Sequence, residues 1–410
     1  MAPRVAVLHH PRSFFPLDLV HQLGERVDIV WVTDGSSAGD PVVHRLLHRL
    51  GPVADLAGLD GDEAAAALAA QGPEGIVSFV DDQVEAAADL AHRLGLVYHS
   101  PEVARNVVDK RLQRAALDRA GLAGPRYWTL AVDATTAETA RLVDRVGYPA
   151  VLKPAQGSGS RGILRVESPA QLGRGLAGES GGGGWLIEEY LEDAPQAEPW
   201  MASYLSVESV VSGGRTGHAA ITGRFPLAEP FRECGNFLPG IIDPDLEQPV
   251  LALVDRAVVA LGIEDAVIHT EVKLTPDGPM LIEIKGRLGG RPPFLLADVS
   301  GVNLFQAACE VALGRPVRVD AGAPRRGVGF WLMLQPPVTA AAVASVSGLE
   351  AVAGLAGVDS VTLNRRPGDP VDWRQGTESH VVAVRGRVDD HRTLGETVEC
   401  IRHQVTIGYH

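Results

Sequence analysis

The chain has 410 residues, enough for two or three domains with a large buried core. Its net charge of −14 argues against nucleic acid or an anionic membrane as the main partner, because such a field repels phosphates. We find no apolar run of signal-peptide or membrane-spanning length, and the three widely spaced cysteines favour neither a disulfide framework nor a zinc site. These features predict a cytoplasmic protein.

Lysine is rare in this chain. Of the 37 lysine and arginine residues only four are lysines: Lys110, Lys153, Lys273 and Lys285. A lysine ammonium is a compact point charge that the planar arginine group does not replace. The four lysines are therefore candidates for positions that need such a charge, although general scarcity of lysine is the alternative.

Short apolar strands alternate with helical patterns in the first third of the chain. We expect strands at residues 4–9, 27–32 and 75–80 and helices at 62–71 and 83–94. This alternation predicts a parallel sheet covered by helices. An N-terminal α/β domain is assigned to residues 1–105.

The middle of the chain has longer strands around a glycine-rich loop. The expected elements are a helix at 106–120, a helical pattern at 137–146, strands at 150–153, 163–166 and 185–190, a flexible glycine link at 181–184, antiparallel strands within 203–223 and 266–284, and a helix at 249–261. We assign residues 106–315 to a central domain and residues 316–410 to a smaller α+β cap, whose last helix covers about 394–405.

Gly157, Gly159 and Gly162 have the spacing of a dinucleotide-binding loop. Such a loop lies between a strand and a helix, whereas residues 163–166 read as a strand, so we exclude a Rossmann site. Backbone amides and the hydroxyls of Ser158 and Ser160 could instead surround phosphate oxygens, with Lys153 at the base of the loop. An ordinary mobile hairpin tip is the alternative.

Residues 269–285 predict a β-hairpin with one charged and one apolar face. A three-residue loop, Pro276-Asp277-Gly278, pairs Thr275 with Pro279. This register pairs Glu271 with Glu283, His269 with Lys285, and Lys273 with Leu281. It places on the other face Thr270, Val272, Leu274, Met280, Ile282 and Ile284.

Two carboxylates in direct opposition destabilise a sheet unless water or a cation separates them. Magnesium accepts one or two carboxylates and completes its coordination with water and substrate phosphate. We therefore predict a magnesium–triphosphate site at Glu271 and Glu283. A solvated charged face is the alternative, and a register shift of one residue would separate the two glutamates.

These motifs resemble the ATP-grasp superfamily, in particular the branch of biotin carboxylase and the L-amino acid (dipeptide) ligases. The stretches that match are Asp109-Lys110 and residues 151–162, 187–191, 269–271 and 282–290. The resemblance is strongest over about residues 70–315. It implies a multidomain α/β and α+β fold: a parallel α/β N-terminal domain, a central ATP-grasp domain with a mobile lid at about 125–190, and a C-terminal α+β cap.

The resemblance also implies roles for individual residues, with ATP and Mg²⁺ as cofactors. Lys110 and Lys153 would bind phosphate, Glu271 and Glu283 magnesium, and Arg287 the acyl-phosphate and the oxyanion formed on attack. The lid loop would be formed by Gly157, Ser158, Gly159, Ser160 and Gly162, and the adenine would be held by Glu188, Glu189 and Leu191.

Position 285 departs from the family pattern, which usually has an asparagine there as a further metal ligand. Lys285 cannot ligate a metal, but its ammonium can pair with a phosphate or a glutamate. We hypothesise that Lys285 partly replaces the charge of a second magnesium ion.

Residues 224–239 resemble the loop that lines the acceptor pocket of amino-acid ligases. Glu233 could hold a substrate ammonium there with Asn236 beside it, although a purely structural loop fits equally well. Asp82, at the end of a strand, is a further candidate, and Gly290 would allow close approach of an acyl group.

The implied reaction is ATP-dependent amide formation between small-molecule carboxylate and amine substrates through an acyl-phosphate. This reaction releases ADP and phosphate. The chain could also form a homodimer. The alternatives are a carboxylase or formate-activating enzyme, or a nucleotide-binding homologue without catalysis.

Overall fold

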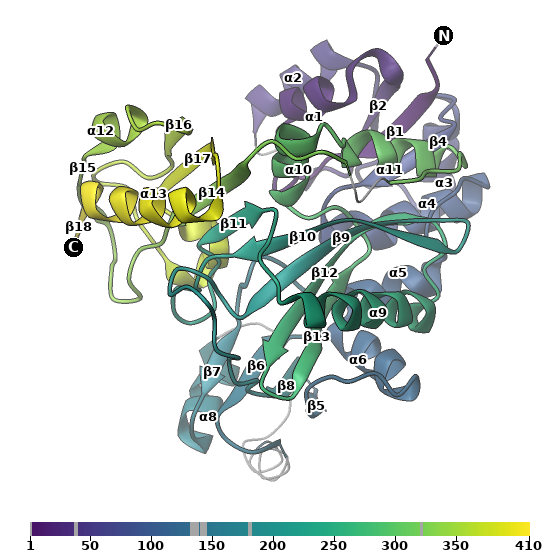
Figure 1. The fold of residues 1–410 in the computed structure, drawn as a ribbon. Helices are drawn as coiled ribbons and strands as arrows, with labels where there is room; N and C mark the ends of the chain where they lie inside the picture. The colour runs from purple at the N-terminus through teal and green to yellow at the C-terminus, as the bar shows by residue number, and fades with distance from the viewer. Residues whose placement is uncertain (1, 37–39, 132–138, 140–145, 179–182, 320–322) are drawn as a thin grey trace.

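The computed structural model describes residues 2–36, 40–131, 139, 146–178, 183–319 and 323–410. The N-terminal region contains a parallel sheet with the strand order β3-β2-β1-β4 (Figure 1). Its strands are β1 (Arg4–Leu8), β2 (Asp28–Thr33), β3 (Val53–Asp55) and β4 (Gly75–Ser78). Its helices are α1 (Pro16–Leu23), α2 (Pro41–Leu50), α3 (Gly61–Ala69) and α4 (Val84–Leu94). The predicted parallel α/β arrangement is confirmed.

The single helix expected at 106–120 is wrong, because the structure has two helices there. α5 (Pro101–Val108) ends at Asp109, and α6 (Lys110–Arg119) begins directly after it. Asp109 has the extended torsion angles φ −90° and ψ 111°, and its carboxylate accepts a hydrogen bond from the backbone N–H of Arg111. An aspartate in this conformation caps a new helix, and the break makes Lys110 the first residue of α6.

A second, antiparallel sheet has the order β5-β8-β6-β7. It comprises β5 (Tyr127–Leu130), β6 (Ala150–Pro154), β7 (Leu164–Val166) and β8 (Trp185–Glu189), with α8 (Pro169–Gly178) beside β7. Buried side chains including Leu152, Trp185 and Ile187 form its core. The helical pattern at 137–146, apart from residues 139 and 146, and the first part of the glycine link lie outside the described residues.

The largest sheet has eight antiparallel strands in the order β13-β12-β9-β10-β11-β14-β17-β16. Five of them precede residue 316: β9 (Tyr204–Ser212), β10 (Arg215–Arg224), β11 (Gly235–Leu238), β12 (Ala266–Thr275) and β13 (Gly278–Lys285). The other three are β14 (Val328–Leu334), β16 (Val358–Leu363) and β17 (Val382–Val388). The pairing of β11 with β14 therefore continues the central sheet into the C-terminal cap.

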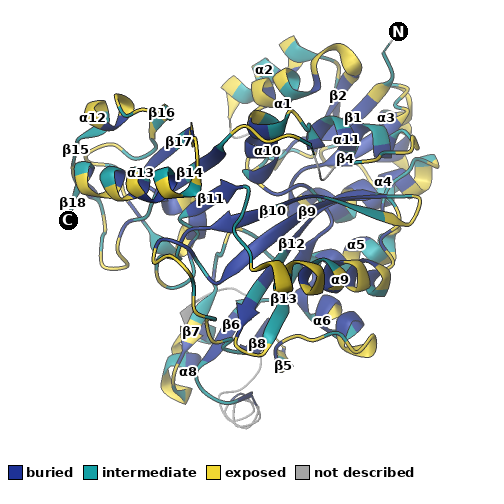
Figure 2. Ribbon diagram, viewed as in Figure 1, coloured by how far each residue is buried: buried dark blue, intermediate teal, exposed yellow. Residues whose placement is uncertain are grey.

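The remaining elements cover this sheet or complete the cap. They are α9 (Pro244–Leu261), α10 (Pro292–Ser300), α11 (Leu304–Ala312), β15 (Val343–Ser347), α12 (Leu349–Ala353), the 3₁₀ segment η4 (Trp373–Ser379), α13 (His391–Gln404) and β18 (Thr406–Tyr409). α11 contacts both β4 and β12, and its buried side chains join the core shared by the two sheets (Figure 2). Among the described helices, none alone has the length and apolar character needed to cross a bilayer; the bent pair α10–α11 meets that test only jointly.

Candidate functional site

The β12–β13 hairpin brings Glu271 and Glu283 into direct opposition, as predicted, and His269 lies opposite Lys285. The predicted turn is wrong. Thr275 pairs with Gly278 across a two-residue turn, so Lys273 lies opposite Met280 rather than Leu281. A bulge between Val272 and Glu271, where Ile282 has no partner on β12, restores the register before the glutamates. The shorter turn and the bulge therefore shift the register in opposite directions, and Glu271 still lies opposite Glu283.

The same bulge changes which side chains of β13 are buried. Leu281 and Ile284 are buried against the core, whereas Met280 and Ile282 are only partly buried. The prediction that Met280 and Ile282 lie on the apolar face is therefore wrong. With a two-residue turn Met280 shares the face of Lys273, and the unpaired Ile282 turns toward the cavity described below.

Glu283 contacts two of the rare lysines. Lys110 Nζ lies 3.1 Å from Glu283 Oε1, and Lys285 Nζ donates a hydrogen bond to the same oxygen at 2.6 Å. Burial raises the pKa of Glu283, but the two ammonium groups outweigh burial and lower that pKa below its ordinary range. Burial lowers the pKa of Lys110, and Glu283 opposes this effect. Glu283, the predicted metal ligand, and Lys110, a predicted phosphate-binding lysine, therefore contact each other directly.

Glu271 contacts the buried Arg224, for which the sequence predicted no role. Arg224 Nη2 lies 3.6 Å from Glu271 Oε1, and Arg224 Nη1 lies 3.0 Å from Glu233 Oε2. The side-chain oxygen of Asn236, in the amide orientation that satisfies both groups, accepts from Arg224 Nη1 at 2.8 Å. His269 Nε2 lies 3.0 Å from Arg224 Nη2. Arg224 thus joins the predicted metal ligand Glu271 to both predicted acceptor-loop residues.

Asp81, the first residue of the 3₁₀ segment η3 (Asp81–Gln83) that follows β4, holds the predicted catalytic arginine. Its two carboxylate oxygens accept hydrogen bonds from Arg287 Nε at 3.1 Å and Nη2 at 2.5 Å. Lys285 Nζ lies 3.5 Å from Asp81 Oδ2. The neighbouring Asp82, which the sequence analysis selected, instead pairs with Arg12. Asp81 therefore brings the N-terminal region into contact with Arg287 and Lys285.

Lys153 belongs to a buried triad with Glu188 and Arg114. Lys153 Nζ donates to Glu188 Oε2 at 2.5 Å, and Arg114 Nε donates to the other carboxylate oxygen. Arg114 also donates to the backbone oxygens of Leu281 at 2.9 Å and Ile282 at 2.5 Å. The triad connects the small sheet, α6 and β13, and it fixes Lys153 at the base of the glycine loop.

The triad predicts a specific dependence of stability on pH. Burial raises the pKa of Glu188, but Arg114 and Lys153 lower it to about 2, below the ordinary 4.5. Since the folded-state pKa is depressed, this group contributes about 3 kcal/mol above about pH 4.5, and the contribution disappears as the pH falls toward 2. Glu188→Gln should remove this part of the acid dependence. Urea unfolding from about pH 6 to about pH 3 checks it, and equal slopes for both proteins would contradict it.

The glycine loop is followed by β7, so the exclusion of a Rossmann site is confirmed. Lys110 Nζ donates to the carbonyl oxygen of Gly157 at 2.9 Å, which ties the loop to α6. The backbone N–H of Thr377, in η4, donates to the oxygen of Gly159 at 2.8 Å. Gly376 has φ +68°, and a Cβ there would lie 2.0 Å from that oxygen. The cap thus approaches the loop closely at a position that only glycine allows.

Known proteins resemble the part of the chain that carries most of these residues. The family described as ATP-grasp domain matches residues 146–292, which include Lys153, Glu188, Glu271, Glu283 and Arg287. Residues 146–292 are therefore similar to an ATP-grasp domain. Carnosine synthase 1 from Homo sapiens is 32% identical over 266 residues, which cover 59% of this chain and 31% of that protein. Alanine–anticapsin ligase from Bacillus subtilis is 26% identical over 248 residues, 55% of this chain and 50% of that protein.

A solved L-amino acid ligase has the same overall fold. The L-amino acid ligase from Bacillus licheniformis superposes with a TM-score of 0.79 and covers 100% of this chain and 99% of that chain, at 18% identity. This likeness shows the fold. In contrast, the sequence matches to carnosine synthase 1 and to alanine–anticapsin ligase span only 31% and 50% of the length of those two proteins.

A large cavity of about 900 Å³ lies beside several of the predicted site residues, and its volume is at the upper end of the range typical of ligand sites. Predicted residues that line it are Lys153, Ser160, Glu188, Glu189, Leu191, Glu233 and Glu271. Residues 226–231, Val338 and Trp373 add a mainly apolar wall. Gly290 is exposed, and a Cβ there would meet no atom within 4 Å, so protein packing does not require a glycine at this position.

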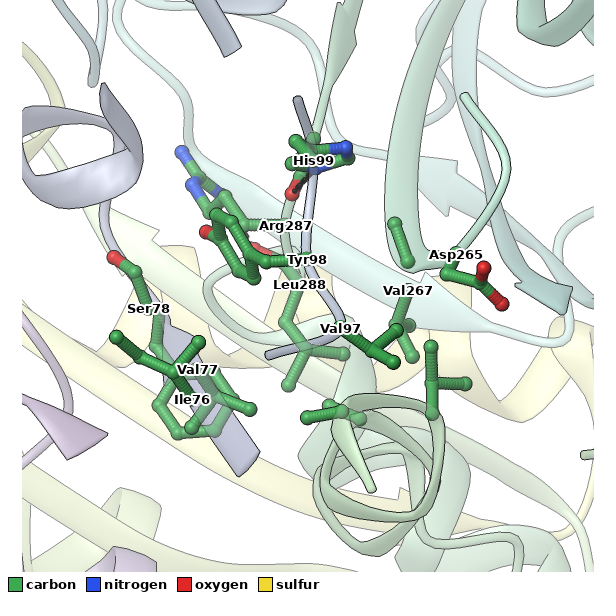
Figure 3. A pocket seen from close by; sticks show the side chains of 16 residues that line it. Ile76, Val77, Ser78, Val97, Tyr98, His99, Asp265, Val267, Arg287 and Leu288 are labelled. Carbon is green, nitrogen blue, oxygen red and sulfur yellow. Dashed lines mark hydrogen bonds between the residues drawn. The ribbon is translucent and has the colours of Figure 1, made fainter. Parts of the chain in front are cut away.

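A second cavity, of about 30 Å³, lies behind Arg287 and has room for about one water molecule (Figure 3). It is lined by Tyr98, His99 and apolar side chains of β4 and α11. The Tyr98 hydroxyl and His99 Nδ1 are buried and have no hydrogen-bond partner among the residues that the structure describes. An ordered water would satisfy such groups, so we assign this cavity to the packing between the N-terminal region and the large sheet.

Three functional candidates were not predicted from the sequence: Asp81, Arg114 and Arg224. Arg114 lies four residues after Lys110, so helical spacing places both on one face of α6, and this was a usable signal. Arg224 begins the acceptor-loop stretch, but nothing local indicates that it is buried. Asp81 differs from Asp82 only in the direction of its side chain. In the last two cases only the packing of distant segments selects the residue.

Proposed function

We propose that the chain is an ATP-dependent carboxylate–amine ligase that forms an amide bond through an acyl-phosphate and releases ADP and phosphate. The observation that carries this proposal is the opposition of Glu271 and Glu283 on one hairpin, with Lys110 3.1 Å from Glu283. The ATP-grasp domain match and the ligase names of the relatives support it. We further propose the division into residues 1–105, 106–315 and 316–410, with a lid at about 125–190.

The proposed nucleotide site uses the lid and the hairpin together. Lys153, held by Glu188, and Lys110 would pair with phosphate oxygens, while Glu189 and Leu191 line the part of the cavity assigned to adenine. The backbone amides and serine hydroxyls of residues 157–162 would cover the phosphates. Bound magnesium, held by Glu271 and Glu283, would supply neutralisation of the developing charge on the transferred phosphate.

The proposed acyl-transfer site lies on the side of Arg287 and Arg224. Arg287, oriented by both oxygens of Asp81, retains N–H groups that would stabilise the oxyanion formed on amine attack. Glu233 lines the cavity and is partly neutralised by Arg224, so its exposed carboxylate edge would accept a substrate ammonium. The loop covering residues 157–162, in contact with the cap, would keep water from the acyl-phosphate. Amino acids are the substrates that this arrangement favours.

Phosphate release measured with amino acids singly and in pairs, and with bicarbonate and formate, tests the proposal. We expect turnover only when a carboxylate and an amine substrate are present together, and mass spectrometry should detect their amide. Turnover with bicarbonate or formate alone would favour a carboxylase or formate-activating enzyme. Nucleotide binding without turnover under any of these conditions would favour a non-catalytic homologue.

A further inference from the structure

Lys285, the last residue of β13, has an unusual position for a lysine. Its side chain is only 8% exposed, although the ammonium is strongly hydrated in water. Nζ lies 2.6 Å from Glu283 Oε1 and 3.5 Å from Asp81 Oδ2. The ammonium therefore lies between a carboxylate of the hairpin and a carboxylate of the N-terminal region, which together offset the cost of burying it.

Asp81 is itself fixed, so the position of Lys285 is defined from both sides. Arg287 binds both oxygens of Asp81, and the Asp81 side chain is only 7% exposed. With its oxygens occupied by Arg287 and Lys285, Asp81 is not available as a ligand for a metal at the hairpin. Glu271 and Glu283 meet their cationic neighbours through Oε1. Within the described part of the chain, their Oε2 atoms are the carboxylate oxygens left for a divalent ion at the hairpin.

Two carboxylates can ligate one divalent ion more readily than two. Two-metal sites hold their ions about 3.5–4 Å apart and need carboxylates that both ions share. Among the residues that the structure describes, no group of three or more His, Cys, Asp and Glu side chains is arranged to hold a metal ion. One ion can use both glutamates and complete its coordination with phosphate and water. A second ion sharing Glu283 would face the Lys285 ammonium across the carboxylate oxygen that Lys285 already occupies, and the two positive charges would repel each other.

We propose that the site takes one divalent ion per bound nucleotide and that Lys285, anchored by Asp81, supplies the charge of a second. This inference rests on the proposed nucleotide site. It extends that proposal from the identity of the ligands to the number of metal ions. Replacing Lys285 by a neutral oxygen donor should open the second position.

Equilibrium dialysis against a non-hydrolysable ATP analogue and excess Mn²⁺ measures both bound species at once. We expect a ratio of bound Mn²⁺ to bound nucleotide of about one for the wild type and about two for Lys285→Asn, a twofold change. Arg315→Gln is the matched control, because it removes a positive charge from an exposed ion pair with Glu310 outside the site. Its ratio should equal that of the wild type.

The outcomes separate this inference from the function on which it rests. A ratio of two in the wild type, or a ratio of one in both Lys285→Asn and Lys285→Gln with nucleotide bound, overturns the role of Lys285 and leaves the ligase proposal intact. Absence of bound nucleotide in the wild type overturns both. A wild-type ratio of two overturns the inference without any variant, and Lys285→Gln provides a second variant if Lys285→Asn does not fold.

Discussion

Glu283→Gln is expected to lower the turnover number of the proposed ligase reaction by about 10²–10³-fold, the range seen when a charge-stabilising group is lost from an active site. The substitution removes a negative charge that Lys110 and Lys285 share at 3.1 Å and 2.6 Å. It also replaces a carboxylate ligand of the proposed magnesium ion by a weaker amide. The side-chain shape is retained, so the fold should persist.

Phosphate release with a productive pair of substrates measures this effect, and circular dichroism checks the fold of the variant. Glu396→Gln is the matched control, because Glu396 is exposed on α13. Its turnover should remain within about twofold of the wild type, as expected for a surface position. A Glu283→Gln rate equal to that of the control would show that this carboxylate has no part in the reaction.

Arg114→Leu is expected to lower the free energy of unfolding by about 3–5 kcal/mol, the cost of breaking a buried ion pair on one side. Arg114 is buried and bonds the Glu188 carboxylate and two backbone oxygens of β13. Without it, Glu188 keeps Lys153 as its only charged partner among the described residues. Because the triad joins the small sheet to the hairpin, we also expect weaker nucleotide binding.

Urea unfolding followed by circular dichroism tests this prediction. Arg119→Leu, on the same helix, is the control. Arg119 is exposed, and within the described part of the chain its side chain bonds only the backbone oxygen of Ala115, at 3.2 Å. Its unfolding free energy should change by no more than about 0.5 kcal/mol. Equal losses in the two variants would show that the triad contributes nothing beyond helix α6 itself.

Local patterns predicted the parallel N-terminal sheet, the antiparallel strands and the opposition of Glu271 and Glu283. The alternation of apolar and polar residues along a strand fixes which side chains share a face, and it depends on neighbouring residues alone. The details of the turn were less predictable. Turn length and bulge position differ by small local energies, and here a shorter turn and a bulge at Ile282 compensate each other.

The sequence contained a signal for the break between α5 and α6 at Asp109, but the apolar periodicity of residues 106–120 favoured a single helix. Aspartate is a favoured N-cap, and the side chain bonds the N–H of Arg111 in the structure. This break brings Lys110 to the start of α6, where its ammonium reaches both Gly157 and Glu283. A local capping preference therefore has a direct consequence for the proposed phosphate site.

The sequence by itself determined the hairpin, the opposition of Glu271 and Glu283 within it, and the positions of the scarce lysines at the motifs. Only the tertiary structure decided which cations neutralise that face. Arg114 and Arg224 are buried by segments far away in the chain, and Asp81 rather than Asp82 points toward Arg287. The continuation of the central sheet into the cap at β11 and β14 was likewise decided by packing. The physical reason is that periodicity specifies which face of an element is apolar, whereas the partner of a buried charge depends on how distant elements pack together.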